Sequence, residues 1–254
     1  MRFGAALDLR FDQSFEEFVA FLREQGLSHV EIRQGYLDTN PDAPTPERVR
    51  RVADGADLTV TVHAPFRDCH LGNLNERLRV ATVASVRDAL DFAAAADAVG
   101  VVVHGGSVRP RYPGRVQRRA RDQAVRSLRA CADHAATVEV PLCVENQRDT
   151  GSKRRNTATP ERLAALLDDV GAGSELRVTL DVGHAKVAGV PVEAFVDAVG
   201  DRIHVVHLHD NDGTDDDHDP LPAFRSVATE IDAPYNVLEM KSLADIERCV
   251  AGTG

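Results

Sequence analysis

Tryptophan is absent from this chain of 254 residues, which also has only three tyrosines and four cysteines. So few aromatic side chains leave little with which to wedge apart the base pairs of a DNA duplex. The cysteines, which are Cys69, Cys131, Cys143 and Cys249, include no Cys-x-x-Cys pair. They are therefore expected to be reduced packing residues of an intracellular protein, and neither a disulfide framework nor a zinc site.

Long apolar runs are also missing, and the first residues, Met1-Arg2-Phe3-Gly4, do not resemble a signal peptide. The sequence therefore predicts a cytoplasmic protein that does not enter a membrane. Positive charge is in deficit, because 40 acidic residues outnumber 30 basic ones and the net charge is −10. This balance argues against wholesale binding of nucleic acid, although it leaves room for a local basic patch.

Eight short apolar runs are distributed along the whole chain. They are Phe3–Leu9, Val30–Ile32, Leu58–Val62, Val101–His104, Leu142–Val144, Val178–Leu180, Val205–His209 and Tyr235–Leu238. The runs are short and continuous, which is typical of parallel strands that are covered on both faces. We therefore expect each run to be a buried strand of one parallel sheet.

A helical segment follows each run. Ser14 and Glu17 make a capping box, and Gly26 ends the helix that this box begins. Pro46 and Pro160 each follow a threonine at a first helical position, where the missing N–H costs nothing. Further helices are expected at 75–98, within 115–134, at 192–199, at 222–231 and at 242–250.

Eight such units in this length predict one α/β domain over residues 1–254, folded as a (β/α)₈ TIM barrel. No linker interrupts the pattern. The alternative is a doubly wound open sheet, but no Gly-x-Gly-x-x-Gly follows the first strand. The dinucleotide-binding version of that fold therefore lacks its signature.

Residues that can ligate metals stand where the predicted strands end. They are His63, His104, Glu145, Asp181, His184, His207 and Glu239, with Asp216 and His218 in the loop after the seventh strand. In a barrel all strand C-termini converge on one mouth, so residues from most of the chain would surround one pocket. Imidazole nitrogens mixed with carboxylate oxygens suit Zn²⁺, Mn²⁺ or Fe²⁺ and are too rich in nitrogen for Ca²⁺.

Each of these residues also has a simpler explanation by itself. His63 could make a backbone hydrogen bond at a strand end, Asp181 could cap a helix, and Glu239 could bond a neighbouring strand. These explanations do not account for the joint placement at the ends of strands three to eight, so a metal site is predicted. His209 faces the mouth beside His207 and either contacts the substrate or orients a ligand. The remaining histidines, His29, His70, His134 and His204, are expected to be structural or exposed.

Five motifs together resemble those of the xylose-isomerase-like barrel superfamily. They are His63-Ala64-Pro65, Glu145-Asn146, Leu180-Asp181-Val182-Gly183-His184, His207-Leu208-His209-Asp210 and Leu238-Glu239, and they extend over nearly the whole chain. That superfamily contains sugar and sugar-phosphate isomerases and epimerases, and also the DNA-repair enzyme endonuclease IV of AP endonuclease family 2. The motifs indicate the superfamily and do not select one activity within it.

The resemblance implies two ligand sets. The ketose 3-epimerase pattern implies one divalent ion on Glu145, Asp181, His207 and Glu239, with both glutamates as catalytic acid and base and His184 as a substrate contact. The endonuclease IV pattern implies three zinc ions on a larger set: His63, His104, Glu145, Asp181, His184, His207, Asp216, His218 and Glu239. Zn²⁺ or Mn²⁺, in one to three copies, is therefore the expected cofactor.

The chain departs from the endonuclease IV pattern at two motifs. Gly183 stands where cysteine is usual before the histidine, and His209-Asp210-Asn211-Asp212 replaces an Asn-Asp-Ser-Lys segment. A Gly-Glu-Gly segment that is common in both branches is here Asp219-Pro220-Leu221-Pro222. Substrate contacts from the loop after the seventh strand are therefore not transferred to this chain.

Two enzymatic functions, and one without turnover, fit these residues. The first is a sugar or sugar-phosphate isomerase or epimerase, in which Glu145 and Glu239 exchange protons beside the carbonyl through an enediolate. The second is an endonuclease IV-like zinc-dependent phosphodiesterase acting on abasic DNA, which also uses the additional ligands. The third is a barrel that binds metal and a small ligand only. We favour the first, because the acidity of the chain weakens sequence-independent attraction to DNA.

Basic residues follow the fourth and fifth strands. They are Arg109, Arg111, Arg115, Arg118, Arg119 and Arg121, and then Arg148, Lys153, Arg154 and Arg155. Arginine presents a planar, permanently charged donor to phosphate, although about half of this set would be ordinary solvated helix surface. Arg148 and Arg154 lie just beyond Glu145-Asn146 and are the predicted phosphate contacts. The expected partner is a small sugar or sugar phosphate, with nucleic acid less favoured, and no oligomeric state is predicted.

Overall fold

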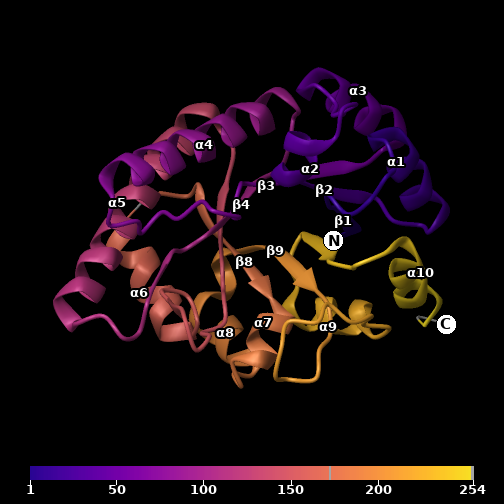
Figure 1. Cartoon of the computed structure of the whole chain (residues 1–254). Helices are drawn as coiled ribbons and strands as arrows, with labels where there is room; N and C mark the ends of the chain where they lie inside the picture. Colours follow the sequence, from indigo (N-terminus) through magenta and orange to yellow (C-terminus); the bar gives the residue numbers. More distant parts are fainter. Residues whose placement is uncertain (172, 253–254) are drawn as a thin grey trace.

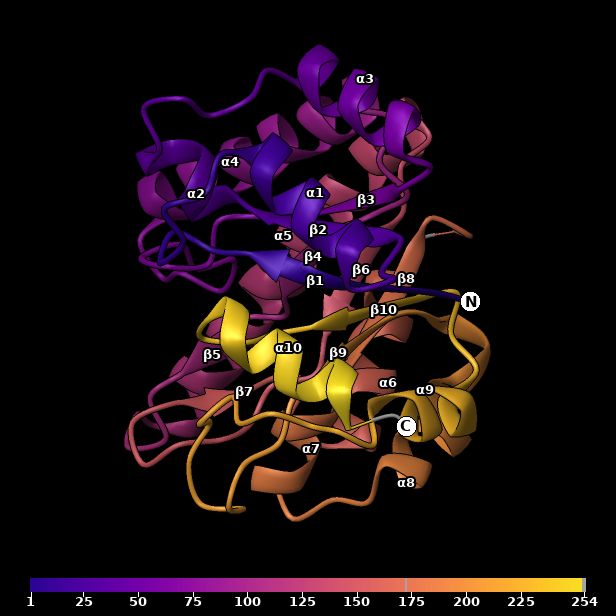
Figure 2. The same cartoon turned by 90° about the vertical axis from the view of Figure 1, so that its right-hand side faces the viewer.

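A computed structural model describes residues 1–171 and 173–252, in which eight parallel strands close into one barrel (Figure 1). The strands are β1 (Arg2–Leu7), β2 (His29–Arg33), β3 (Thr59–His63), β4 (Val101–His104), β6 (Leu142–Glu145), β8 (Leu176–Asp181), β9 (Ile203–Leu208) and β10 (Tyr235–Leu238). They pair in chain order, and β10 returns to β1, beside which it lies in Figure 2. The predicted strands and the predicted (β/α)₈ barrel are thus confirmed.

Helices surround the barrel on its outer side (Figures 1 and 2). They include α1 (Phe15–Glu24), α3 (Pro46–Ala56), α4 (Glu76–Ala95), α5 (Gly114–Val138), α6 (Pro160–Val170), α8 (Val192–Val199), α9 (Phe224–Ile231) and α10 (Leu243–Ala251). The capping box of Ser14 and Glu17 is present, and the hydroxyls of Thr45 and Thr159 cap α3 and α6. Within the described residues, we find no helix with the length and apolar character that a membrane crossing requires.

Several short elements were not expected from the sequence. They are α2 (Gln34–Thr39), α7 (Val182–Val187), a 3₁₀ turn (Gly200–Arg202) and an antiparallel pair formed by β5 (Ser107–Val108) and β7 (Arg154–Arg155). In addition, α5 continues to Val138, past the expected end at His134. Elements of two to six residues are too short to show a hydrophobic period, so pattern alone does not reveal them.

The barrel encloses an apolar layer of small side chains. Ala6, Val102, Cys143, Val205 and Val237 form a buried cluster that is separate from the larger core between strands and helices. Residues two apart on a strand point to the same side. The residue two positions beyond each member of this inner layer therefore also points inward, one level closer to the C-terminal mouth.

That next level is a ring of charged and imidazole side chains, which we call the mouth ring. It consists of Asp8, Arg33, His63, His104, Glu145, Asp181, His207 and Glu239, one residue from each strand or from the position just past its end. With the exception of His104, which is partly exposed, the members are buried. The two-residue period thus delivers eight polar side chains from the whole chain to one place.

Candidate metal centre

Four members of the mouth ring bring ligand atoms to one position. The Nδ1 atom of His207 lies 3.2 Å from Oε1 of Glu239 and 3.8 Å from Oε1 of Glu145. It also lies 3.9 Å from Oδ2 of Asp181. Atoms that bind a common ion at about 2.0–2.2 Å stand roughly 3–3.5 Å from one another. A small inward movement would therefore let all four side chains hold one cation.

Some of these converging atoms lack partners. Among the described residues, His207 Nδ1 is buried without a hydrogen bond of acceptable geometry, and so is Oε2 of Glu145, the second oxygen of one of the four converging side chains. A buried polar atom without a partner costs free energy, and a cation at this position would remove that cost. The donor set of nitrogen and carboxylate oxygen suits Zn²⁺ or Mn²⁺, so the residues present fit the metal that the motifs imply.

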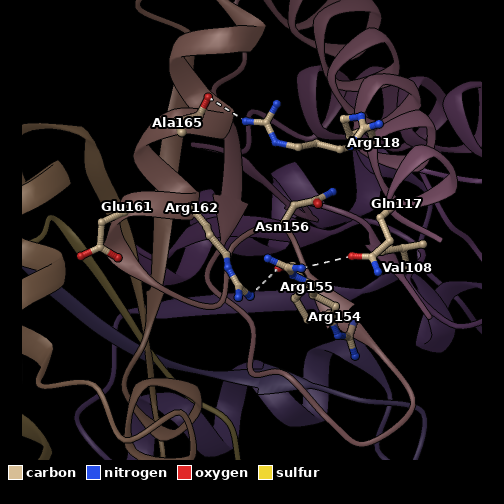
Figure 3. Close-up of a pocket in the computed structure, with 11 residues that line it drawn as sticks. Val108, Gln117, Arg118, Arg154, Arg155, Asn156, Glu161, Arg162 and Ala165 are labelled. Carbon is tan, nitrogen blue, oxygen red and sulfur yellow. Dashed lines mark hydrogen bonds between the residues drawn. The ribbon is translucent and has the colours of Figure 1, made fainter. Parts of the chain in front are cut away.

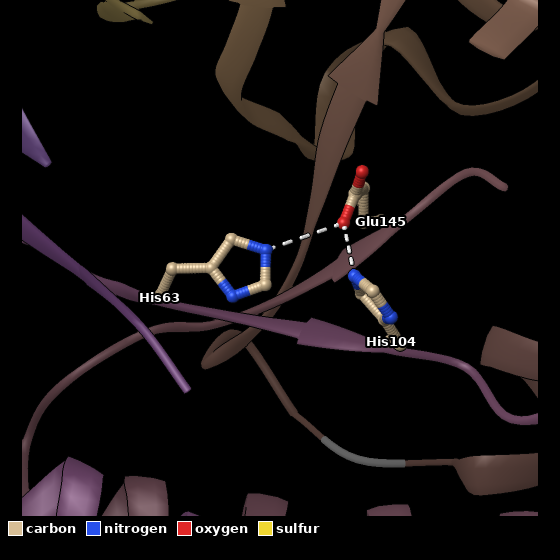
Figure 4. Close-up of side chains that lie close together, drawn as sticks. All are labelled: His63, His104 and Glu145. Carbon is tan, nitrogen blue, oxygen red and sulfur yellow. Dashed lines mark ion pairs between the residues drawn. The ribbon is translucent and has the colours of Figure 1, made fainter. Parts of the chain in front are cut away.

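A second group of ligand atoms lies beside the first (Figure 4). His63 Nε2 lies 3.5 Å, and His104 Nε2 lies 2.9 Å, from Oε2 of Glu145. The other nitrogen of His63, Nδ1, is 2.9 Å from the carbonyl oxygen of Ala64 and must therefore donate to it. That bond fixes the tautomer and leaves the lone pair of Nε2 directed at Glu145. Histidines in metal sites commonly show the same arrangement, in which the nitrogen that does not bind the metal donates a hydrogen bond to a carbonyl or carboxylate.

Asp216 forms the centre of a third group. Its Oδ2 lies 3.2 Å from His184 Nε2 and 3.5 Å from His218 Nε2. His218 Nδ1 donates to the carbonyl oxygen of Glu239 at 3.0 Å, which again leaves Nε2 for the cluster. Seven of the nine predicted metal-ligand residues thus line one cavity. The other two, Asp181 and His207, do not line it but contact members of the set, His184 at 3.2 Å and Glu239 at 3.2 Å respectively.

The loop that carries Asp216 and His218 is closed at its base. The backbones of Asp210 and Asp219 exchange two hydrogen bonds of 2.8 Å, so both ends of the loop are held together. Lys186 Nζ contacts Asp210 Oδ1 at 2.6 Å, and His218 adopts a left-handed backbone with φ of 49°. This closure places Asp216 and His218 above the mouth of the barrel, although the loop sequence departs from the motifs to which it was compared.

Three buried charged residues, Asp8, Glu31 and Arg33, escaped the sequence prediction. Glu31 Oε2 lies 3.1 Å from Nε2 of His207, so that nitrogen donates and Nδ1 is left for the shared position. Arg33 pairs with Glu239 and, at 3.0 Å, with Asp8. The signal was present in β2, where charged residues occupy alternate positions of an otherwise apolar strand.

Burial and charge act in opposite directions on the glutamates. Burial raises the pKa of Glu145, but the charge of His104 and hydrogen bonds from His104 and His184 lower it well below its ordinary value. Burial likewise raises the pKa of Glu239, and Arg33 and His207 overcome this effect and lower it. Both carboxyl groups are therefore ionised at neutral pH and available as ligands or bases.

The histidine protons respond to the same charges. Burial lowers the pKa of His207, whereas Glu239 and Glu31 raise it and prevail, so it stands well above the ordinary value. The pKa of His184 is also well above the ordinary value, because Asp181 and Asp216 outweigh burial. Metal ligation requires these rings to be neutral, so metal uptake would release protons.

His209 is held against Asp181. Its Nε2 lies 3.1 and 3.2 Å from the two oxygens of that carboxylate, and its ring stacks on His218 at 4.1 Å. An added Cβ on Gly183 would stand 2.0 Å from Cε1 of His209, so only glycine leaves room for this ring. The side chain of His209 is fully buried and does not line the cavity, which favours the orienting role over a substrate contact.

The cavity above the mouth ring has a volume of about 330 Å³, and we call it the metal pocket. Arg148 lines it and pairs with Asp216 at 3.3 Å, so this predicted phosphate contact faces the pocket. Arg154 does not line it, and instead donates to Oε1 of Gln117 on the outer side. Lys153 and Arg155 line the pocket in its place, because neighbouring residues of an extended segment point to opposite sides.

The remaining histidines have structural partners, as expected. His29 is buried between the hydroxyls of Thr59 and Thr61, and burial lowers its pKa to about 3. His70, His134 and His204 contact Ser107, Asp91 and the carbonyl of Val99, respectively. The four cysteines are free, and Cys131, Cys143 and Cys249 are buried.

Relatives with similar sequences include proteins of Methanocaldococcus and of Mycobacterium. The protein MJ1311 of Methanocaldococcus jannaschii is 34% identical over 65% of this chain, and the match spans 56% of the length of that relative. A protein of Mycobacterium ulcerans named probable endonuclease 4 is 30% identical over 76% of this chain and 73% of its own length.

Solved structures with the same fold superpose on nearly the whole chain. A D-tagatose 3-epimerase-like protein superposes with a TM-score of 0.82 at 26% identity, over 98% of this chain and 94% of its own. The TTHB071 protein of Thermus thermophilus, in a crystal soaked with ZnCl₂, has a TM-score of 0.74 at 25% identity, over 100% and 98%. The family model described as xylose isomerase-like TIM barrel matches residues 19–233. The chain therefore belongs to the xylose isomerase-like TIM barrel family.

Proposed function

We propose that this chain is a divalent-metal-dependent isomerase or epimerase that acts on a sugar phosphate through an enediolate. The observation that carries the proposal is the approach of two glutamates, Glu145 and Glu239, to one nitrogen of His207 at the floor of the metal pocket. The likeness to a D-tagatose 3-epimerase-like protein, at 26% identity over 98% of the chain, supports the same chemistry.

When bound, the divalent ion supplies Lewis-acid stabilisation for the negative charge that an enediolate develops. The side chains of the chain supply the proton transfers. Glu145 and Glu239 are both ionised and buried, so either carboxylate is ready to remove the proton beside the carbonyl. Arg33 pairs with Glu239 and holds its carboxylate in a fixed orientation. In an isomerisation, the carboxylate that removed the proton would return it to the neighbouring carbon. In an epimerisation, the other glutamate would first take a proton from water and then deliver it to the opposite face of the same carbon, while the first glutamate keeps the proton that it removed.

The pocket also offers unpaired cations for the far end of a substrate. Within the described part of the chain, Arg67, Lys153 and Arg155 line the metal pocket and have no carboxylate partner. Arg33 and Arg148 differ, because both are paired with acidic residues of the site. A phosphate held by these three cations would provide binding energy that can be used at the reacting carbon.

The activity is tested by hydrogen exchange. The protein, loaded with Mn²⁺ or Zn²⁺, is incubated in D₂O with a panel of ketose phosphates and free ketoses, and proton NMR follows the carbon beside the carbonyl. We expect deuterium to enter that carbon in at least one ketose phosphate, together with a new epimer or isomer. Absence of exchange across the panel, in a protein shown to hold metal, would reject the proposal.

The phosphate contact is tested by a pair of double variants. Lys153→Gln/Arg155→Gln is expected to raise KM for the phosphorylated substrate on the order of tenfold or more and to leave a free sugar nearly unaffected. Arg50→Gln/Arg51→Gln on α3 removes two positive charges from exposed positions and serves as the matched control. Equal effects of both double variants would show that only general electrostatics is involved.

A second candidate function is an endonuclease IV-like phosphodiesterase acting on abasic DNA. The observation in its favour is the approach of His63 and His104 to Glu145, which a single-ion epimerase does not require. The 30% identity to a probable endonuclease 4 of Mycobacterium ulcerans points the same way. Metal-dependent cleavage of a duplex with one abasic site, without deuterium exchange in any ketose phosphate, would establish this function in place of the first.

A further inference from the structure

A second cavity lies outside the barrel wall, between α5 and α6, and we call it the arginine hollow (Figure 3). Its volume is about 430 Å³, which is within the range of small-molecule sites. Gly114, Gln117, Arg118 and Arg121 form its α5 side, at spacings that place them on one helix face. Arg162 of α6, with Arg154 and Arg155 of β7, completes the basic lining.

The arginines of the hollow divide into neutralised and available ones. Arg121 pairs with Asp169, and Arg162 pairs with Asp149 at 2.8 Å, so two of the charges are balanced. Among the residues that the structure describes, the guanidinium of Arg154 donates only to the neutral Gln117, at 3.1 Å. Within the described residues Arg118 has no carboxylate partner, and an added Cβ on Gly114 would stand 3.4 Å from its Nη1. The available guanidinium groups are therefore those of Arg118 on α5 and Arg154 on β7, together with that of Arg155, which the hollow shares with the metal pocket.

Acidic groups do not fill the gap between them. Glu161 is the one carboxylate residue that lines the hollow among the described residues, and its Oε2 accepts a hydrogen bond from Thr159 at 2.7 Å. Figure 3 shows its carboxylate directed away from Arg118 and Arg154. A local excess of positive charge thus persists on a chain whose net charge is −10. Such an excess in a concave site favours an anion.

We propose that the arginine hollow binds a small polyanion that carries phosphoryl groups. Arg118 and Arg154 present planar forks that match the oxygens of phosphate. The site is distinct from the metal pocket, with which it shares only Arg155 among the described residues. It therefore adds a binding site to the proposed enzyme and does not depend on the metal or the sugar.

The test uses inorganic pyrophosphate, titrated calorimetrically into the whole, metal-free protein at fixed ionic strength. Arg118→Gln/Arg154→Gln is expected to weaken binding at least about tenfold, because two charge-assisted contacts are lost. Arg50→Gln/Arg51→Gln removes the same charge elsewhere and is expected to bind as the unaltered protein does. Lys153→Gln changes the metal pocket and not the hollow, so it should retain the pyrophosphate event that Arg118→Gln/Arg154→Gln loses.

Unchanged affinity in Arg118→Gln/Arg154→Gln would overturn the proposal, and so would an equal loss in the α3 control. The position of the anion is checked by soaking crystals in tungstate and locating tungsten by anomalous scattering. A peak between Arg118 and Arg154 is expected. A peak confined to the metal pocket would also overturn the proposal. Because no metal or sugar is present, failure here is separable from failure of the proposed enzymatic activity.

Discussion

Two layers inside the barrel lie two residues apart on the same strands, and their chemistry is opposite. The inner layer, Ala6, Val102, Cys143, Val205 and Val237, packs small apolar side chains against one another. The mouth ring above it gathers carboxylates and imidazoles, some of whose buried atoms lack hydrogen-bond partners. Burial of such groups opposes folding unless partners or a cation satisfy them. The inner layer therefore contributes stability, whereas the mouth ring gives up stability for a binding site.

The largest expected effect is at the mouth ring. Glu239→Gln keeps the shape of the side chain and removes its charge, so the fold should survive while a ligand and a base are lost. We expect turnover to fall on the order of 10³-fold, as measured by deuterium exchange, with an unchanged circular dichroism spectrum. A variant that binds metal and turns over normally would show that Glu239 has only a structural role.

The next largest effect is expected at Glu31, which contacts His207 of the mouth ring. Glu31→Gln weakens the acceptor that fixes His207 with Nδ1 toward the shared position. Residues that hold metal-bound histidines typically account for 10–100-fold in metal affinity, and we expect a loss of about that size. Competition with a fluorescent chelator measures it. Retention of the original affinity would mean that packing alone orients His207.

A substitution in the inner layer should lower the stability of the protein and leave its metal affinity nearly unchanged. Val205→Ala removes two buried methyl groups one level below His207. We expect the free energy of unfolding to fall by about 1–2 kcal/mol in urea titrations, with metal affinity changed by less than about threefold. A large loss of affinity with little loss of stability would contradict the division of roles between the two layers.

An effect confined to acid pH concerns the buried polar network at the lower end of the barrel. Burial lowers the pKa of His29 from 6.5 to about 3, so between these values the unfolded chain binds a proton that the folded chain does not. The contribution of His29 to stability is therefore fully present above pH 6.5 and is lost as pH falls, by up to about 1.4 kcal/mol per pH unit. His29→Gln should show a shallower decline in metal-free urea titrations. Parallel declines would contradict this assignment.

The sequence predicted the barrel because eight buried strands and their capped helices leave periodic signals over many residues. It also predicted nine candidate ligands, seven of which line one cavity, because strand ends in a barrel converge. Asp8, Glu31 and Arg33 were not predicted, because they lie on the first two strands or just past their ends, outside the ligand motifs at the ends of strands three to eight. Alternation along β2 would have shown that Glu31 and Arg33 share a face.

Side-chain direction in loops was less predictable. Arg154 was expected at the pocket because it lies near Glu145 in the chain, but pairing of β7 with β5 turns it outward. That pairing involves only two residues on each strand and leaves no pattern in the sequence. The coupling of Gly183 to His209 was equally hidden, because it arises from a contact between α7 and the end of β9.

The most direct test of the metal centre is a count of bound ions. The protein and its Glu145→Gln variant are loaded with Zn²⁺ or Mn²⁺, dialysed against metal-free buffer and examined by elemental analysis. Glu145 contacts His63, His104, His184 and His207, so its charge is central to the cluster. We predict at least one tightly held ion per chain in the unaltered protein and a clear loss in the variant. One ion would favour the epimerase, and two or three would favour the phosphodiesterase arrangement. No ion, or the same number in both proteins, would contradict a metal centre at the mouth ring.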